Sequence, residues 1–86
     1  MEIREVFAIN MRRRRQAAAF SQEELAHRAG LDRTYISSLE RGLYAASIVV
    51  VDRLARELGV EAADLLQRPK VPVSRKKGGG VKTVEK

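Results

Sequence analysis

The segment from residue 22 to residue 41, QEELAHRAGLDRTYISSLER, constrains the fold of this chain more than any other. Ala26 stands in the middle of a predicted helix with only a methyl group, so a second helix can approach it closely. Gly30 follows four residues later, and glycine readily adopts the positive φ that ends a helix. Ile36 and Leu39 give the next segment an apolar face. This spacing predicts two short helices that cross at a steep angle.

Helix start and stop signals recur along the rest of the chain. Residues that cap helix starts and glycines that end helices alternate with apolar stretches. Helices are expected at residues 3–18, at 22–29 after a capping box of Ser21 and Glu24, at 33–41 after Asp32, at 48–58 after Ser47, and in a short segment containing Leu65 and Leu66. Five helices with short connections predict an all-α fold class, with one compact five-helix domain in residues 1–68.

Two of these helices carry an apolar stripe that should face the core. In residues 3–18 the stripe comprises Ile3, Val6, Phe7, Met11, Ala17 and Ala18, and Arg14 falls near its middle. In residues 48–58 it comprises Ile48, Val51, Leu54, Ala55 and Leu58. We expect either that the stem of Arg14 lies along the core edge with its charge in water, or that the helix rotates locally.

The composition argues against several classes of site. The chain has no cysteine and one histidine, so no disulfide framework, metal site or cofactor is expected. His27 is the sole imidazole and no carboxylate pair has a special spacing, so catalysis is not expected. The first residues lack a signal-peptide pattern, and no apolar run is long enough to span a membrane. We expect a cytoplasmic protein with no membrane partner and no small-molecule substrate.

The net charge of +6 is unevenly distributed along the sequence. Residues 1–68 contain 11 arginines and 10 acidic residues, a net charge of +1, whereas residues 69–86 contain six basic residues and one glutamate, a net charge of +5. The second segment also holds both prolines and a run of three glycines, which predicts a flexible, disordered basic tail. This tail either solubilises the chain or attracts phosphates without sequence preference.

The predicted helix of residues 33–41 has one continuous polar surface. On a helical wheel Tyr35, Ile36 and Leu39 face the core, and the opposite arc, about 140° wide, holds Arg33, Thr34, Ser37, Ser38 and Arg41. Guanidinium groups donate two hydrogen bonds to a guanine edge, and short hydroxyl side chains let a helix enter the major groove. A polar stripe alone is more often a solvated face, but the crossing helix before it favours binding to double-stranded DNA.

Individual roles follow from position on the two helices. Arg33 and Thr34 lie in the first turn, which recognition helices present to base edges, and the two serines of the polar surface are further base-contact candidates. Gln22 begins the preceding helix, where free backbone N–H groups favour a phosphate oxygen, although an ordinary exposed glutamine is the alternative. Tyr35 lies at the edge of the core arc, where its hydroxyl should face the DNA backbone.

At these residues the chain resembles the XRE family of helix-turn-helix proteins, the Cro and phage-repressor type, over about residues 7–67. The similar stretch, FSQEELAHRAGLDRTYISSLERG, runs from residue 20 to residue 42, and its LDRTYIS and LERG portions most resemble restriction-modification controller proteins. The resemblance implies a lambda-repressor-like DNA-binding domain, base contacts from Arg33, Thr34 and Ser38, phosphate contacts from Gln22 and Arg41, and an ion pair between Arg15 and Glu40.

The ion pair also has a geometric rationale, since Glu40 points from its helix toward the first helix, where Arg15 flanks the apolar stripe. Three features depart from the family pattern: Arg14 where an apolar residue is usual, Ala46 where proline is common, and the β-branched residues 48–51. Each of these departures concerns packing rather than contact with a DNA groove.

The sequence therefore predicts a sequence-specific transcription regulator that binds inverted half-sites as a homodimer. Val49 points to the side occupied by Arg53 and Arg56, and it is either an ordinary exposed valine or, with Val50, part of a dimer contact. A restriction-modification controller, a phage-type repressor and an antitoxin-like autoregulator all fit these residues. A protein-interaction module on the same fold is the alternative without DNA.

Overall fold

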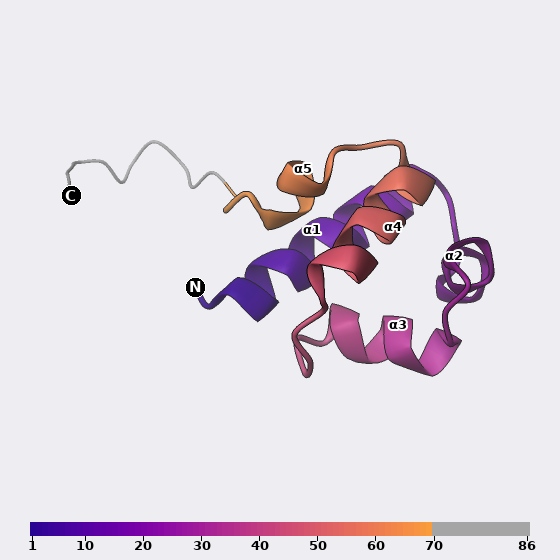
Figure 1. Ribbon diagram of the computed structural model, residues 1–86, viewed down its shortest axis with the longest axis horizontal. Coiled ribbons are helices and arrows are strands. Elements are labelled where there is room, and N and C mark those ends of the chain that lie inside the picture. Colours follow the sequence, from indigo (N-terminus) through magenta and orange to yellow (C-terminus); the bar gives the residue numbers. More distant parts are fainter. Residues whose placement is uncertain (70–86) are drawn as a thin grey trace, which may run out of the picture.

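The computed structural model describes residues 1–69, which contain only helices and their connections (Figure 1). The helices are α1 (Ile3–Ala17), α2 (Gln22–Ala29), α3 (Arg33–Glu40), α4 (Ile48–Leu58) and α5 (Ala62–Leu66). The predicted all-α, five-helix fold is confirmed, although the ends predicted at residues 18 and 41 each lie one residue too far along. The predicted basic tail lies, from residue 70 onward, outside the described residues.

Serine side chains cap two of the helix starts. Ser21 Oγ accepts a hydrogen bond from the N–H of Glu24 at 2.9 Å, so the Ser21 half of the predicted capping box is present. Ser47 Oγ accepts one from the N–H of Val50 at 3.1 Å. Asp32 occupies the N-cap position of α3, but its side chain makes no cap hydrogen bond, so the prediction that it caps α3 is correct only for its position.

A residue with left-handed φ follows each of the helices α1 to α4, and after α3 it is Gly42 with a φ of 72°. Gly30 and Gly59 close α2 and α4 with φ of 70° and 73°, as their positions predicted. Ala19, just beyond α1, adopts a φ of 62° although it carries a Cβ. That conformation costs an L-residue other than glycine about 1 to 2 kcal/mol, so the turn after α1 holds backbone strain.

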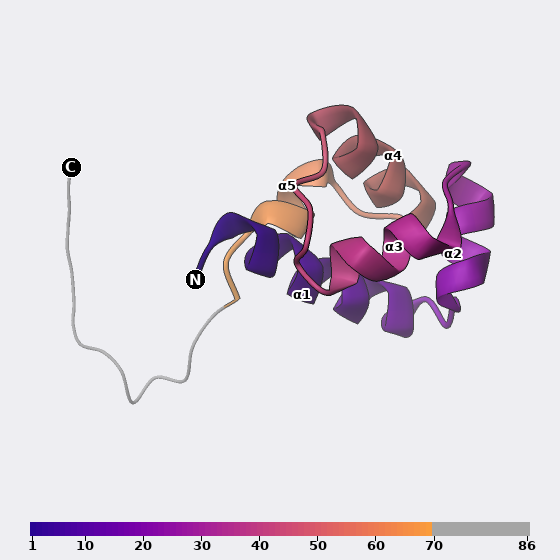
Figure 2. The ribbon, with the colours of Figure 1, turned by 90° about the horizontal axis from the view of Figure 1, so that it is seen from below.

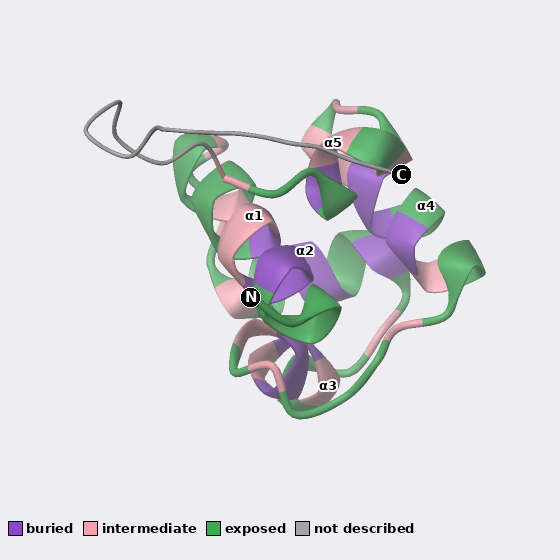
Figure 3. Cartoon of the chain, turned by 90° about the vertical axis from the view of Figure 1, so that its left-hand side faces the viewer, coloured by how far each residue is buried: buried purple, intermediate pink, exposed green. Residues whose placement is uncertain are grey.

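Helix α1 runs through the middle of the domain and packs against both α3 and α5 (Figure 1). Helix α2 packs against α3 and α4, and α4 packs against α5. Seen from below in Figure 2, α3 lies across the front of the domain. The buried parts of the helices in Figure 3 face one another. The largest of the fully buried side chains are Val6, Met11, Leu25, Ile36, Leu39, Leu54 and Leu65. One shared core therefore holds α3 while its outer side stays open.

The predicted stripes are wrong at some end positions of their helices. Ile3 is 44% exposed and Ile48 is 82% exposed, although Val6 and Val51, three residues further along each helix, are buried. Ala17, at the other end of α1, is exposed as well. Arg14 is exposed and borders a groove beside α5, so its charge stays in water. This exposure agrees with the first of the two alternatives, in which the charged end of the side chain remains in water.

Candidate nucleic-acid interface

The crossing of α2 and α3 forms the scaffold of the candidate interface. Ala26 is 3% exposed, and its carbonyl accepts a hydrogen bond from the N–H of Leu31 at 2.8 Å across the turn. Ile36 and Leu39 are completely buried on the inner side of α3. Of the residues singled out by their spacing, Ala26, Ile36 and Leu39 are buried and fix the orientation of α3, whereas Gly30 is exposed at the turn between the two helices.

The outer side of α3 presents two unpaired arginines. Arg33 and Thr34 in its first turn are exposed, Ser37 is half-buried, and Arg41 at its C-cap is exposed. Within residues 1–69, neither Arg33 nor Arg41 forms an ion pair, whereas three other exposed arginines each pair with a carboxylate. The two guanidinium groups on this surface are therefore available to an anionic partner.

Ser38 does not share this exposed surface, and the prediction that it does is wrong. It is only 7% exposed. On the helical wheel it lies about 60° from Tyr35, at the border of the core arc. The chain also folds back here, since the N–H of Leu43 donates to the carbonyl of Ser38 at 3.1 Å. A side chain as short as serine is covered at such a border, so Ser38 is not retained as a base-contact candidate.

A buried ion pair joins α1 to the end of α3, as predicted. Arg15 Nη2 donates to Oε1 of Glu40 at 3.0 Å, Arg15 Nε donates to Oε2, and the two side chains are 13% and 4% exposed. Arg15 Nη1 also donates to the carbonyl of Phe20 at 2.8 Å, which fastens the connection between α1 and α2. The hydrogen bond to Glu40 raises the pKa of Arg15 above its ordinary value; burial opposes this shift and the negative charge of Glu40 adds to it.

Gln22 joins the same set of contacts, a feature that sequence analysis missed. Its Nε2 donates to Oε1 of Glu40 at 3.0 Å, and its side chain is half-buried at the first position of α2. A glutamine amide carries two N–H donors and one carbonyl acceptor, so this bond uses one donor and leaves the other groups free to bind elsewhere. Arg15, Glu40 and Gln22, here called the Glu40 network, connect α1, α2 and α3.

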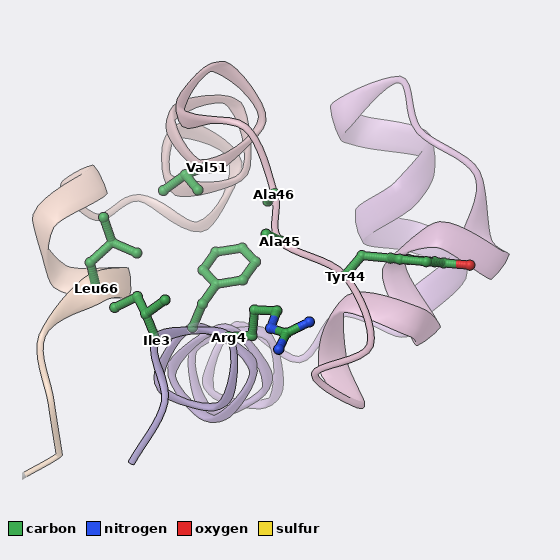
Figure 4. Close-up of a pocket in the computed structure, with 8 residues that line it drawn as sticks. Ile3, Arg4, Tyr44, Ala45, Ala46, Val51 and Leu66 are labelled. Atoms are coloured by element: carbon green, nitrogen blue, oxygen red, sulfur yellow. The ribbon is translucent and has the colours of Figure 1, made fainter.

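Tyr35 and Tyr44 stack beside the end of α3. Their ring centroids are 6.5 Å apart and the ring planes are inclined by 29°, an offset arrangement that aromatic pairs favour. Tyr35 is half-buried, whereas Tyr44 is 55% exposed. In Figure 4 the side chain of Tyr44 extends away from Ile3 and Leu66. Sequence analysis missed Tyr44 because it lies in the connection from α3 to α4, where no helical periodicity predicts a direction.

An apolar surface surrounds the first turn of α4. Val49 is 62% exposed and Ile48 is 82% exposed, whereas Val50 is half-buried and packs against the core. Of the two residues predicted for a dimer contact, Val49 therefore lies openly on the surface and Val50 only in part. Nearby, Ile3 and Leu66 point toward each other at a small groove of about 60 Å³, which is lined by α1, α4, α5 and the connection from α3 to α4 (Figure 4).

The single histidine of the chain, His27, is exposed on α2. Across residues 1–69, no three His, Cys, Asp or Glu side chains come together in a way that could hold a metal ion. None of the helices found in that range is long and apolar enough to cross a membrane.

Comparison with known proteins gives one family and several related structures. A family model described as Helix-turn-helix (HTH_3) matches residues 11–65. A hypothetical transcription factor from Neisseria meningitidis is 44% identical over 68 residues, and the match spans 79% of this chain but only 64% of that relative. A crystal structure of a hypothetical transcription factor from Neisseria has a TM-score of 0.77 and 44% identity, covering 79% of this chain and 78% of that one.

Two further solved structures are similar over most of the described domain. The restriction-modification controller protein C.AhdI from Aeromonas hydrophila has a TM-score of 0.70 and 39% identity, covering 72% of this chain and 94% of its own. SinR, a master regulator for biofilm formation solved in complex with DNA, has a TM-score of 0.69 and 31% identity, covering 71% of this chain and 98% of its own. These likenesses extend well beyond the two crossing helices.

Proposed function

This chain belongs to the helix-turn-helix family of DNA-binding transcription regulators, and from that premise we propose that it recognises one particular duplex sequence through α3. Helix α3 enters the major groove while α2 crosses the phosphate backbone beside it. One observation carries the proposal: Arg33 and Thr34 are exposed in the first turn of α3 while Ile36 and Leu39 beneath them are fully buried. Because the inner side is held in the core, the exposed turn is presented rigidly.

Base recognition is assigned to the first turn of α3. Arg33 donates two hydrogen bonds to the O6 and N7 acceptors of a guanine, a contact for which a planar guanidinium is well suited. Thr34 reaches a neighbouring base edge or a thymine methyl group. Ser37, one turn further along and half-buried, makes at most a secondary contact.

Phosphate contacts position the helix in the groove without reading sequence. Gln22 offers its second amide N–H at the start of α2, where the helix dipole and free backbone N–H groups favour the same anion. Tyr35 contributes its hydroxyl, and Arg41 a full positive charge that is unpaired within residues 1–69. These contacts supply affinity that falls as salt rises.

A homodimer with inverted half-sites about 34 Å apart completes the proposal. Val49 and Ile48 form the centre of the contact, because burial of two such exposed side chains is favourable by about 1.5 to 3 kcal/mol each. Val50, already packed in part against the core, lies at the edge of that contact. Dimerisation about this surface is consistent with a closed two-fold arrangement.

The biological role is proposed from likeness. C.AhdI is named as a restriction-modification controller, and by analogy this chain regulates the promoter of its own operon. A phage-type repressor and an antitoxin-like autoregulator remain the competing roles, and a protein-interaction module is the competing function without DNA. The proposal includes no enzymatic activity and places the protein in the cytoplasm.

The test is selection of duplexes from a random pool by the purified full chain, followed by binding measurements over a salt series. We expect one palindromic sequence to be enriched and to remain preferred over unrelated duplexes at every salt concentration, while all affinities fall as salt rises. Footprinting upstream of the coding region then locates the natural site. Failure to enrich any sequence, with no salt-dependent binding, overturns the proposal and favours the interaction module.

A further inference from the structure

A polar groove lies between α1 and α5, apart from the α3 surface. Its volume is about 370 Å³, and its lining includes Asn10, Arg13, Arg14, Asp64, Gln67 and Arg68. None of these residues belongs to α2, α3 or the connection from α3 to α4, and α1 lies between α5 and α3 in Figure 1. The DNA contacts proposed for α3 therefore leave this groove unused.

The wall of the groove is held by specific hydrogen bonds. Asn10 Nδ2 on α1 donates to the carbonyl of Leu65 at 3.1 Å and to the carbonyl of Gln67 at 2.6 Å, which fastens the end of α5 to α1. Asp64 Oδ2 accepts a hydrogen bond from the N–H of Glu61 at 3.0 Å, so this carboxylate is committed to the cap of α5. The groove is thus a built feature with a defined shape.

Arginine charges dominate the groove. Arg13 and Arg14 are exposed and form no ion pair within residues 1–69. Arg68 Nη2 donates to the carbonyl of Met1 at 3.1 Å, a neutral partner that leaves the guanidinium charge uncompensated. Three guanidinium groups therefore face one lining carboxylate, in a domain whose first 68 residues carry a net charge of only +1.

We propose that this groove binds the phosphate backbone of a second nucleic-acid segment while α3 holds the operator duplex, an inference that rests on the proposed function. Exposed guanidinium groups bind a single anion weakly because water screens the attraction. A duplex instead presents about one charge per 1.7 Å and releases counterions at each contact, so several exposed arginines together bind it well.

The path of the chain favours nucleic acid over an acidic protein. Pro69 lines the groove, and residues 69–86, which continue from it, contain six basic residues and one glutamate. Positive charge therefore continues along the sequence from the rim of the groove. Such an extended series of positive charges matches a long phosphate backbone of high charge density better than an acidic protein. Arg14 is exposed, so packing in the core does not account for an arginine at this position.

The test is a bridging assay with the full chain. The selected operator duplex is attached to beads, and a short unrelated fluorescent duplex is supplied in solution. We expect wild-type protein to retain the fluorescent duplex on the beads. Arg14→Glu should lower retention at least about fivefold at 0.15 M salt. One neutralised phosphate strengthens binding by about this factor when the salt concentration falls from 1 M to 0.15 M. Its affinity for the operator should stay unchanged.

The matched control is Arg12→Glu, which makes the same charge change at another exposed position of α1 that does not line the groove. It should retain the fluorescent duplex as wild type does. Equal losses in the two variants would assign bridging to overall charge and overturn the inference. Arg14→Gln serves as a second variant, with circular dichroism to verify that each variant is folded, and it should lose retention less than Arg14→Glu.

Four other outcomes also overturn the inference. Wild-type protein that binds the operator but retains no second duplex refutes the groove proposal and leaves the proposed function standing. A poly-glutamate peptide that displaces the second duplex at a lower concentration than unlabelled duplex assigns the groove to acidic protein. Inorganic phosphate that abolishes retention at constant ionic strength assigns it to a free anion. Wild-type protein that selects no operator refutes both proposals together.

Discussion

Replacing Glu40 with alanine tests how much the Glu40 network stabilises the domain. The carboxylate is 4% exposed and accepts hydrogen bonds from Arg15 and Gln22. Glu40→Ala leaves the Arg15 charge 13% exposed, with the carbonyl of Phe20 as its remaining protein partner. Removing one member of a buried pair costs about 3 to 5 kcal/mol. Because Arg15 keeps one hydrogen bond and some contact with solvent, we expect about 3 kcal/mol, the lower end of that range.

Thermal unfolding followed by circular dichroism measures this loss. Each kcal/mol shifts the Tm of a domain of this size by about 4 to 8 °C, so Glu40→Ala should lower the Tm by about 12 to 24 °C. The control is Glu24→Ala, which breaks an exposed pair with Arg28 and should cost about 0.5 kcal/mol. The double variant Arg15→Met with Glu40→Ala removes the stranded charge and should be more stable than Glu40→Ala alone. Similar Tm values for Glu40→Ala and Glu24→Ala would refute the reasoning.

Four further substitutions separate specificity, backbone strain and assembly. Arg33→Ala should relax the preference for one base pair by about 1 to 3 kcal/mol, whereas Arg41→Ala should weaken binding to all duplexes alike. Fluorescence anisotropy with matched and mismatched duplexes distinguishes the two effects. A uniform loss of affinity in both variants contradicts the assignment. Ala19→Gly should raise the free energy of unfolding in urea by about 0.5 to 1 kcal/mol, because glycine relieves the left-handed strain; a decrease argues against it. Val49→Glu should be monomeric by light scattering at concentrations where wild type is a dimer, and a dimeric variant excludes this contact.

Local signals predicted most of the fold because each depends on a few neighbouring residues. Ser21 and Ser47 cap the helices that their positions predicted, and Gly30 and Gly59 end those helices in the left-handed conformation. Helical periodicity likewise predicted the burial of residues in the middle of α1, α3 and α4. These features need no knowledge of how the helices are arranged, so they can be derived from sequence alone.

Errors appeared where the position of a helix relative to the core decides the outcome. Ile48 lies on the predicted stripe but is 82% exposed, because periodicity gives a direction and not the length over which a helix is covered. Ser38 lies at the edge of the polar arc but is 7% exposed, because a side chain this short is buried at the border of the core arc. Tyr44 comes from a connection without periodicity, and its place beside Tyr35 arises from the path of that connection.

The contact between Gln22 and Glu40 connects stability with the proposed recognition of DNA. Glu40 is positioned by Arg15, and it holds one amide N–H of Gln22 at 3.0 Å before any partner binds. In the proposed complex the second N–H of Gln22 reaches a phosphate without loss of the first hydrogen bond. Ordering one flexible side chain on binding costs about 0.5 to 1.5 kcal/mol. Because Glu40 already holds the Gln22 side chain, little of this entropy is lost when DNA binds. If Gln22 contacts a phosphate as proposed, Glu40→Ala should also lower DNA affinity, although Glu40 itself does not contact DNA. The Arg15–Glu40 ion pair, which the family resemblance implied, thus also positions Gln22, and only the observed hydrogen bond between Gln22 and Glu40 reveals this.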